Sequence, residues 1–154
     1  EHGITEEVYG IDLVAEQIRI AAGEPISQRV AEAAPRRHAI EARINAEDPF
    51  HGFRPCPGRI DLLYLPGGSG IRVDTHAYGG YTIPQHYDSL VAKVIATGAD
   101  RTEAVARLSR AMRDMHVEGI KTTAPFIALI MDDPDFRRGA YSTAFVDQLL
   151  AKRR

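Results

Sequence analysis

An arginine on an alternating segment is the residue of this sequence best suited to chemistry. Between residues 38 and 46, small or polar residues alternate with apolar ones, which predicts a strand with one polar and one apolar face. The polar face carries Glu41 and Arg43, and Asp48-Pro49 ends the strand. A guanidinium held on a strand suits an anion, because its planar fork binds carboxylate or phosphate through two hydrogen bonds. The alternative is an edge strand on which Arg43 forms a structural ion pair with Glu41 or Glu47.

The composition is typical of one globular domain. The chain has 154 residues, of which 44% are hydrophobic and 26% charged, enough for a core of its own. The net charge of −2 gives no reason to expect nucleic acid, and no apolar run reaches the ~18 residues that cross a membrane. The single Cys56 fits a reducing cytoplasm, and the six histidines show no metal-ligand spacing, so no metal site is expected. A chain that begins with Glu1 suggests a fragment or a processed protein.

Hydrophobic periodicity places the elements that must position these residues. Residues 1–9 are expected to be irregular, Ile11 to Ala22 to be a helix, and residues 24–36 to be a linker with a possible helical turn. Strands are expected at 38–46, 59–65, 71–76 and 90–96, and helices at about 102–115, 123–131 and 143–151. The turn at Pro66-Gly67-Gly68 predicts a hairpin between the second and third strands. Strands followed by helices predict an α+β domain.

Several blocks of this sequence resemble the biotin carboxylases, the ATP-grasp enzymes that carboxylate biotin. The matching blocks are Glu1-His2-Gly3-Ile4-Thr5-Glu6, Gly10–Gly23, Glu41–Pro49, Pro66–Arg72, Gly80–Pro84, Tyr87-Asp88-Ser89 and Gly119–Thr123. Each block alone is weak evidence. Together they follow the family's order across nearly the whole chain with no large insertion between them.

The resemblance implies two parts of a larger protein. Residues 1–36 would be the C-terminal end of an ATP-grasp domain and a linker, and residues 37–154 would be the biotin carboxylase C-terminal domain, built of antiparallel strands and helices. The Gly-rich phosphate loop of the ATP-grasp domain does not occur in this sequence. The glycines at 67–70 precede a predicted strand, which indicates a turn. We therefore expect this chain to be catalytically inactive alone.

The activity implied by the resemblance belongs to the full-length enzyme. It is an ATP-dependent ligase that carboxylates biotin on a carrier protein from bicarbonate, through carboxyphosphate, as in acetyl-CoA, propionyl-CoA or pyruvate carboxylase. The implied cofactors are ATP, Mg²⁺ or Mn²⁺, and biotin, with none expected on this fragment. The implied partners are a biotin carboxyl carrier protein or domain, a second copy in a weak homodimer, and a carboxyltransferase subunit. A cytoplasmic location and a role in fatty acid biosynthesis follow from the same resemblance.

Two other functions stay open at this point. One is a related ATP-grasp carboxylase that acts on another acceptor, such as urea. The other is a non-catalytic α+β interaction or dimerisation domain, without membrane or nucleic-acid partners.

The resemblance assigns catalytic and substrate-binding roles to Arg43 and Glu1. Arg43 would contact bicarbonate and biotin, and would stabilise the negative charge that develops on the ureido oxygen as N1′ loses its proton. Glu1 would be the base that deprotonates bicarbonate.

The resemblance places Arg72 and Asp88 at a homodimer interface. Ser69 stands where family members often have Phe, so an aromatic anchor is missing and the dimer is expected to be weak. The alternative is that Arg72 and Asp88 form a local surface ion pair. No chemical role for Lys93 follows from the sequence.

Overall fold

A three-stranded antiparallel sheet lies at the centre of the protein. The computed structural model describes residues 2–152. The strand order is β1 (His38–Asn45), β8 (Leu90–Gly98) and β6 (Ile71–Thr75), so β8 is the middle strand. β1 pairs with β8 along its whole length, with one irregularity between Ile44 and Asn45. β8 is buried over most of its length, and Lys93 is its only charged residue.

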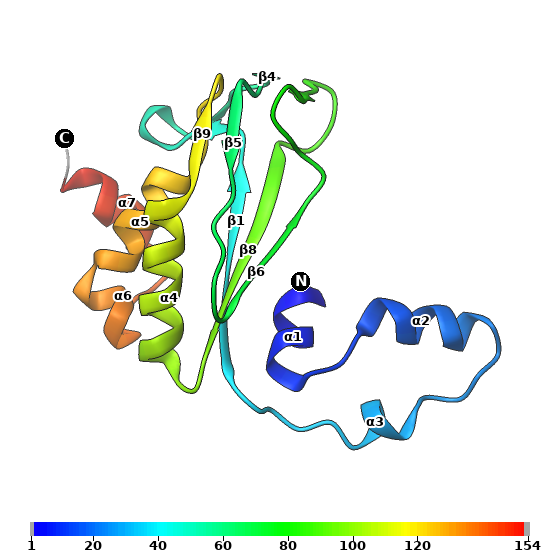
Figure 1. Cartoon of the computed structure of the whole chain (residues 1–154). Helices are drawn as coiled ribbons and strands as arrows, with labels where there is room; N and C mark the ends of the chain where they lie inside the picture. The colour runs from blue at the N-terminus through cyan, green and yellow to red at the C-terminus, as the bar shows by residue number, and fades with distance from the viewer. Residues whose placement is uncertain (1, 153–154) are drawn as a thin grey trace.

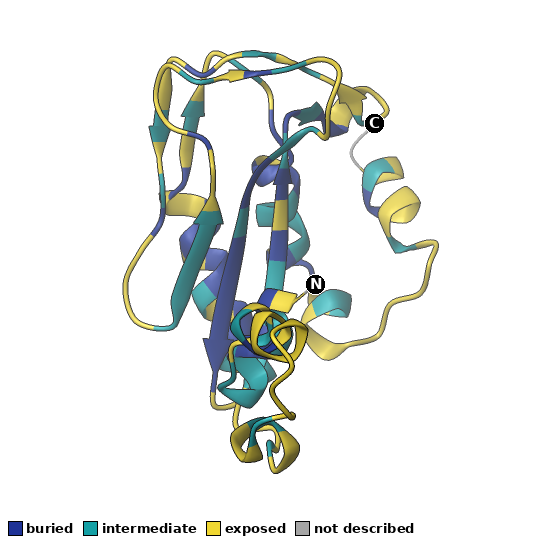
Figure 2. Ribbon diagram, turned by 90° about the vertical axis from the view of Figure 1, so that its right-hand side faces the viewer, coloured by how far each residue is buried: buried dark blue, intermediate teal, exposed yellow. Residues whose placement is uncertain are grey.

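Helices lie on both sides of this sheet (Figure 1). One side carries α4 (Arg101–Asp114), α5 (Ala124–Asp132), α6 (Pro134–Arg138) and α7 (Phe145–Ala151), and the other side carries α1 (His2–Tyr9). α4 begins after Asp100, whose carboxylate accepts a hydrogen bond from the backbone N–H of Glu103 at 2.8 Å. The buried stripe of α4 (Ala104, Val105, Leu108, Ala111 and Met112) packs on the apolar face of the sheet. Figure 2 shows the dark blue of buried residues concentrated on the central strand and the helices behind it.

Short strand pairs close one end of the domain. β2 (Glu47–Asp48) pairs with β3 (Arg54–Pro55), with the 3₁₀ turn η1 (Pro49–His51) between them. β4 (Gly58–Arg59) pairs with β7 (Thr82–Ile83), and β5 (Leu62–Tyr64) pairs with β9 (His116–Glu118). These elements make the α+β class that the sequence predicts. No helix within residues 2–152 has the length and apolar character needed to span a membrane.

The predicted hairpin across Pro66-Gly67-Gly68 is wrong. β5 pairs with β9, and β6 pairs with β8. The turn itself exists, and Gly70 (φ +72°) lies so close to β8 that an added Cβ would be 2.8 Å from the carbonyl oxygen of Thr97. After this turn, β6 pairs with β8 on the side opposite β1, and Ile71 and Val73 pack against the core there.

Residues 2–9 are helical, where an irregular segment was predicted. α1 packs on β1 and β8, and Gly3 approaches the sheet so closely that a Cβ there would lie 2.6 Å from Ile95. Tertiary contact therefore supports a helix that its own sequence barely favours. Two other predictions for this part are confirmed: α2 (Leu13–Ala21) is a helix, and α3 (Gln28–Ala31) is the helical turn expected between residues 24 and 36. Both lie away from the sheet in Figure 1.

Candidate functional site

The sheet face opposite α4 carries the polar residues that the sequence singled out. Two cross-strand rows make up this polar face: Arg43–Lys93–Asp74 and Glu41–Ile95–Arg72. Direct partners in an antiparallel sheet project to the same side, so strands from three distant parts of the sequence build one surface. α1 lies over part of this face, where it contacts β1 and β8.

Arg43 forms a salt bridge with Asp88 on this face. Its Nη2 lies 2.8 Å from Asp88 Oδ2. The other carboxylate oxygen of Asp88 accepts a hydrogen bond from the backbone N–H of Leu90 at 2.9 Å. This bond holds the carboxylate at the start of β8. Both side chains are about half exposed, so the pair adds at most ~1 kcal/mol to stability. The pairings considered from the sequence, Arg43 with Glu41 or Glu47, are not the ones the structure shows.

Arg72 joins α1 to the sheet. Its Nη1 donates to Glu6 Oε2 at 2.7 Å, while Nε and Nη2 donate to the two oxygens of Asp74 at 2.9 and 2.8 Å. The expected alternative of a local Arg72–Asp88 pair is therefore wrong, because each has a different partner. Sequence reasoning missed both partners: Asp74 lies two residues along the same strand as Arg72, whereas Glu6 becomes its neighbour only when α1 folds onto the sheet.

These contacts keep both carboxylates charged. The hydrogen bond from Arg72 lowers the pKa of Asp74 against the opposing effect of burial. Burial of Glu6 opposes its ionisation, but hydrogen bonds from Arg72, His2 and the backbone of Leu13 outweigh it and lower the pKa of Glu6. The hydrogen bonds that Arg72 donates to Asp74 and, to a lesser degree, to Glu6 raise the pKa of Arg72 further above its usual value, against the effect of burial.

Lys93, for which the sequence indicated no chemical role, and Glu41, considered there only as an ion-pair partner of Arg43, lie in the middle of this face. Lys93 makes no hydrogen bond or ion pair with the residues that the structure describes. Oε2 of Glu41 is buried and has no hydrogen-bond partner within that same range. The signal available in the sequence was a lone lysine inside the apolar run from Leu90 to Gly98. Glu1, the predicted base, lies outside the described residues.

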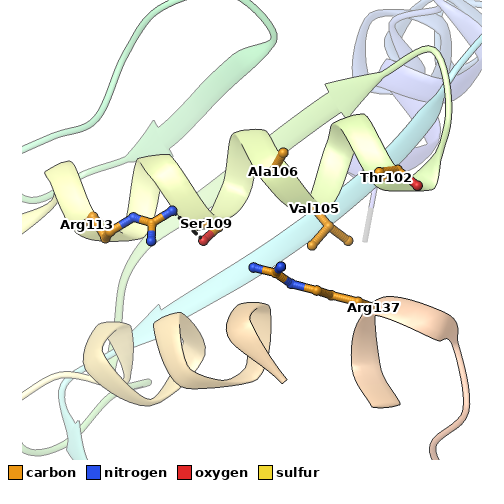
Figure 3. A pocket seen from close by; sticks show the side chains of 6 residues that line it. All are labelled: Thr102, Val105, Ala106, Ser109, Arg113 and Arg137. Carbon is orange, nitrogen blue, oxygen red and sulfur yellow. Dashed lines mark hydrogen bonds between the residues drawn. The ribbon is translucent and has the colours of Figure 1, made fainter. Parts of the chain in front are cut away.

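The pocket shown in Figure 3 lies on the helical side and contains none of the predicted site residues. It has a volume of about 210 Å³ and is lined by Thr102, Val105, Ala106, Ser109, Arg113 and Arg137. Arg113 Nη2 donates to Ser109 Oγ at 2.9 Å, and Arg137 donates to Asp132 at 3.0 Å and to the carbonyl of Met131 at 2.8 Å. The bond from Arg113 lies within α4, and a longer 4.0 Å ion pair links Arg113 to Asp132 of α5, whereas Arg137 ties α6 to α5.

A second, open groove adjoins the polar face. It measures about 630 Å³ and is lined by residues of α1 and α2 together with Arg72. Val14 and Ile18, two apolar residues of α2, lie on it and are 45% and 66% exposed.

The charged residues of the polar face suit an anion better than a cation. Among residues 2–152, no group of three or more His, Cys, Asp or Glu side chains is placed to hold a metal ion. Arg43 and Lys93 are neighbouring cations, whereas Asp74 and Asp88 are already hydrogen-bonded to arginines. The arrangement can therefore hold a small oxyanion against a rigid sheet.

Comparison with known proteins identifies the family. Residues 41–148 match the family described as "Biotin carboxylase C-terminal domain". A biotin carboxylase of Nostoc sp. is 50% identical over 149 residues, which is 97% of this chain and 33% of that protein. One of the pyruvate carboxylase subunits of Methanothermobacter thermautotrophicus is 49% identical over 148 residues, 96% of this chain and 30% of that protein.

A solved structure supports the same family assignment. The biotin carboxylase domain of a thermophilic 2-oxoglutarate carboxylase bound to bicarbonate superposes with a TM-score of 0.93 at 42% identity, over 97% of this chain and 34% of that one. This chain thus spans about a third of the length of the curated relatives it matches. On fold, sequence identity and family match together, the chain belongs to the biotin carboxylase C-terminal domain family.

Proposed function

We propose that this chain is the C-terminal part of a biotin carboxylase, an ATP-dependent ligase that carboxylates biotin on a carrier protein with bicarbonate. The observation that carries the proposal is Arg43, which stands on the open polar face of a sheet whose fold matches a carboxylase domain bound to bicarbonate. The relatives are named as biotin and pyruvate carboxylases, which favours biotin over urea as the acceptor.

Arg43 would perform the central step of this site. Its guanidinium would bind bicarbonate and biotin, and would stabilise the charge that accumulates on the ureido oxygen when N1′ loses its proton. Asp88 would hold the guanidinium in position through their 2.8 Å contact. Glu1 is proposed as the base that takes the proton from bicarbonate. ATP with Mg²⁺ or Mn²⁺ would supply the phosphoryl group that activates bicarbonate.

The division of the chain into two parts belongs to the same proposal. Residues 1–36 would complete an ATP-grasp domain, and residues 37–154 would form the C-terminal domain. Two observations support it: the family match begins at residue 41, and α2 leaves apolar side chains uncovered. The partners proposed for the whole protein are a biotin carrier protein or domain, a second copy that meets Arg72 and Asp88, and a carboxyltransferase subunit, in a cytoplasmic enzyme of fatty acid biosynthesis.

A chimeric enzyme tests the proposed function. Residues 1–154 replace the matched third of the Nostoc biotin carboxylase, and incorporation of labelled bicarbonate into biotin is measured with MgATP. We expect a rate within about tenfold of the parent enzyme, a loss of no more than ~1.4 kcal/mol of transition-state stabilisation. A chimera that folds and binds ATP but does not carboxylate biotin would contradict the proposal.

A further inference from the structure

Lys93 is an unusual residue for its position. It is the only charged side chain in β8, the middle strand of the sheet, whose other residues are apolar or small. The register places it directly opposite Arg43 in the neighbouring strand. Like charges that face each other across an antiparallel pair destabilise the sheet, so an apolar residue would serve the fold at least as well.

Two of the three acids near Lys93 are already hydrogen-bonded to arginines, and the third does not contact Lys93. Asp74, its partner on the other side, accepts two hydrogen bonds from Arg72. Asp88 is paired with Arg43 at 2.8 Å. Glu41 lies diagonally across from Lys93, yet its buried oxygen has no partner among residues 2–152, so Lys93 does not reach it. A cation on a rigid central strand is thus left without a hydrogen-bonded counter-charge from the described residues.

We propose that Lys93 is a second substrate-binding cation, which together with Arg43 holds an oxyanion of the bicarbonate class on this face of the sheet. The inference rests on the proposed function and assigns a residue to it. An anion between two adjacent cations removes the repulsion that the register imposes. The two side chains are complementary: Arg43 offers a planar fork, and Lys93 offers a compact ammonium with three donors.

Kinetics of the chimeric enzyme test this role. Lys93→Met keeps the length of the side chain and removes its charge. We expect the KM for bicarbonate to rise at least about tenfold, the factor that corresponds to one lost charged contact of ~1.4 kcal/mol, while the KM for MgATP stays within about twofold. Lys93→Arg should recover most of the affinity for bicarbonate. Lys152→Met, the same change at an exposed residue at the end of α7, is the matched control and should leave both constants unaltered.

The outcomes separate this inference from the proposed function. An inactive unsubstituted chimera overturns the proposed function. An active chimera in which Lys93→Met leaves the KM for bicarbonate unchanged, or raises both KM values equally, overturns only the role of Lys93. A structural role predicts a lower unfolding temperature for Lys93→Met, whereas our proposal expects it to be unchanged or higher, because a repulsion is removed. If Lys93→Met fails to fold, Lys93→Gln in the same assay decides by the same criteria.

Discussion

At the scale of single residues, the position of Arg43 on a polar strand face was predictable from the sequence, but its partner was not. The alternation from residue 38 to 46 predicts which side chains share the polar face, and the structure agrees. Asp88 is 45 residues away along the chain. Only the register of β1 against β8 brings the two together, and a register between distant strands cannot be derived from local pattern.

Removal of Arg43 should impair carboxylation much more than nucleotide binding. In the chimeric enzyme, Arg43→Ala should lower biotin carboxylation by ~10²–10³-fold, the usual loss when a donor aimed at developing charge is removed. The KM for MgATP should change little, since the side chain of Arg43 pairs with Asp88 on the sheet face. Steady-state rates measure both effects. Glu47→Gln is the control, because Glu47 bonds Asn45 and Ser89 instead of Arg43. An unaltered carboxylation rate for Arg43→Ala would show that Arg43 serves only in its ion pair with Asp88.

At the scale of elements, the sequence predicts what depends on local periodicity. Strands β1 and β8 and helices α2, α4, α5 and α7 are confirmed close to their expected bounds. The failures concern elements that exist because of distant partners. α1 is helical because it packs on the sheet, and β9 is a strand because it pairs with β5. β6 pairs with the long apolar strand β8 instead of forming the expected hairpin with β5. The contact of Arg72 with Glu6 could not be predicted for the same reason, whereas Asp74 shares a strand face with Arg72 and was within reach of local pattern.

The attachment of α1 to β6 should depend on pH. The pKa values of Glu6 and Asp74 are lowered from ordinary values of 4.5 and 3.8, so the unfolded chain binds protons more readily than the folded one. Their contribution to stability is therefore complete above about pH 5 and is lost as the pH falls through the folded pKa values. Arg72 stays charged throughout. Urea unfolding of the chain between pH 3 and pH 7 should show stability decreasing toward acid.

Replacement of Arg72 should remove that contribution. Arg72→Met should cost about 1–3 kcal/mol at pH 7, because it leaves a buried carboxylate without its charged donor, and should flatten the pH dependence. Arg110→Met is the matched control, since its ion pair with Asp114 is exposed and 3.8 Å long. Equal pH profiles for the unsubstituted chain and Arg72→Met would show that the acid sensitivity arises elsewhere.

At the scale of the whole molecule, the chain combines a buried core with an N-terminal segment, residues 10–36, whose helix α2 exposes apolar side chains. The sheet and the helices behind it bury a continuous cluster that runs from Ala42 to Met131. α2 instead exposes Val14, Ile18 and Ile20 by 45%, 66% and 45%. This helix is held by its caps, by the hydrogen bond that Glu16 accepts from the backbone of Ser27 and by a short contact with α1, and isolated helices of this length are marginal. This pattern is the one expected if residues 1–36 complete another domain.

Hydrogen exchange should show this division directly. In the chain alone, amides of α2 should exchange quickly, those of β1 and β8 slowly, and those of α1 at intermediate rates because α1 rests on the sheet. In the chimeric enzyme, the amides of α2 should become protected as the apolar residues are covered. Ile18→Ser should accordingly change the stability of the chain alone by less than about 0.5 kcal/mol but destabilise the chimera, whereas Ile44→Ser, in the fully buried core, should destabilise both. Slow exchange of α2 in the chain alone would show that this helix is stable without a covering domain, and the assignment of residues 1–36 to a second domain would then lose its main structural support.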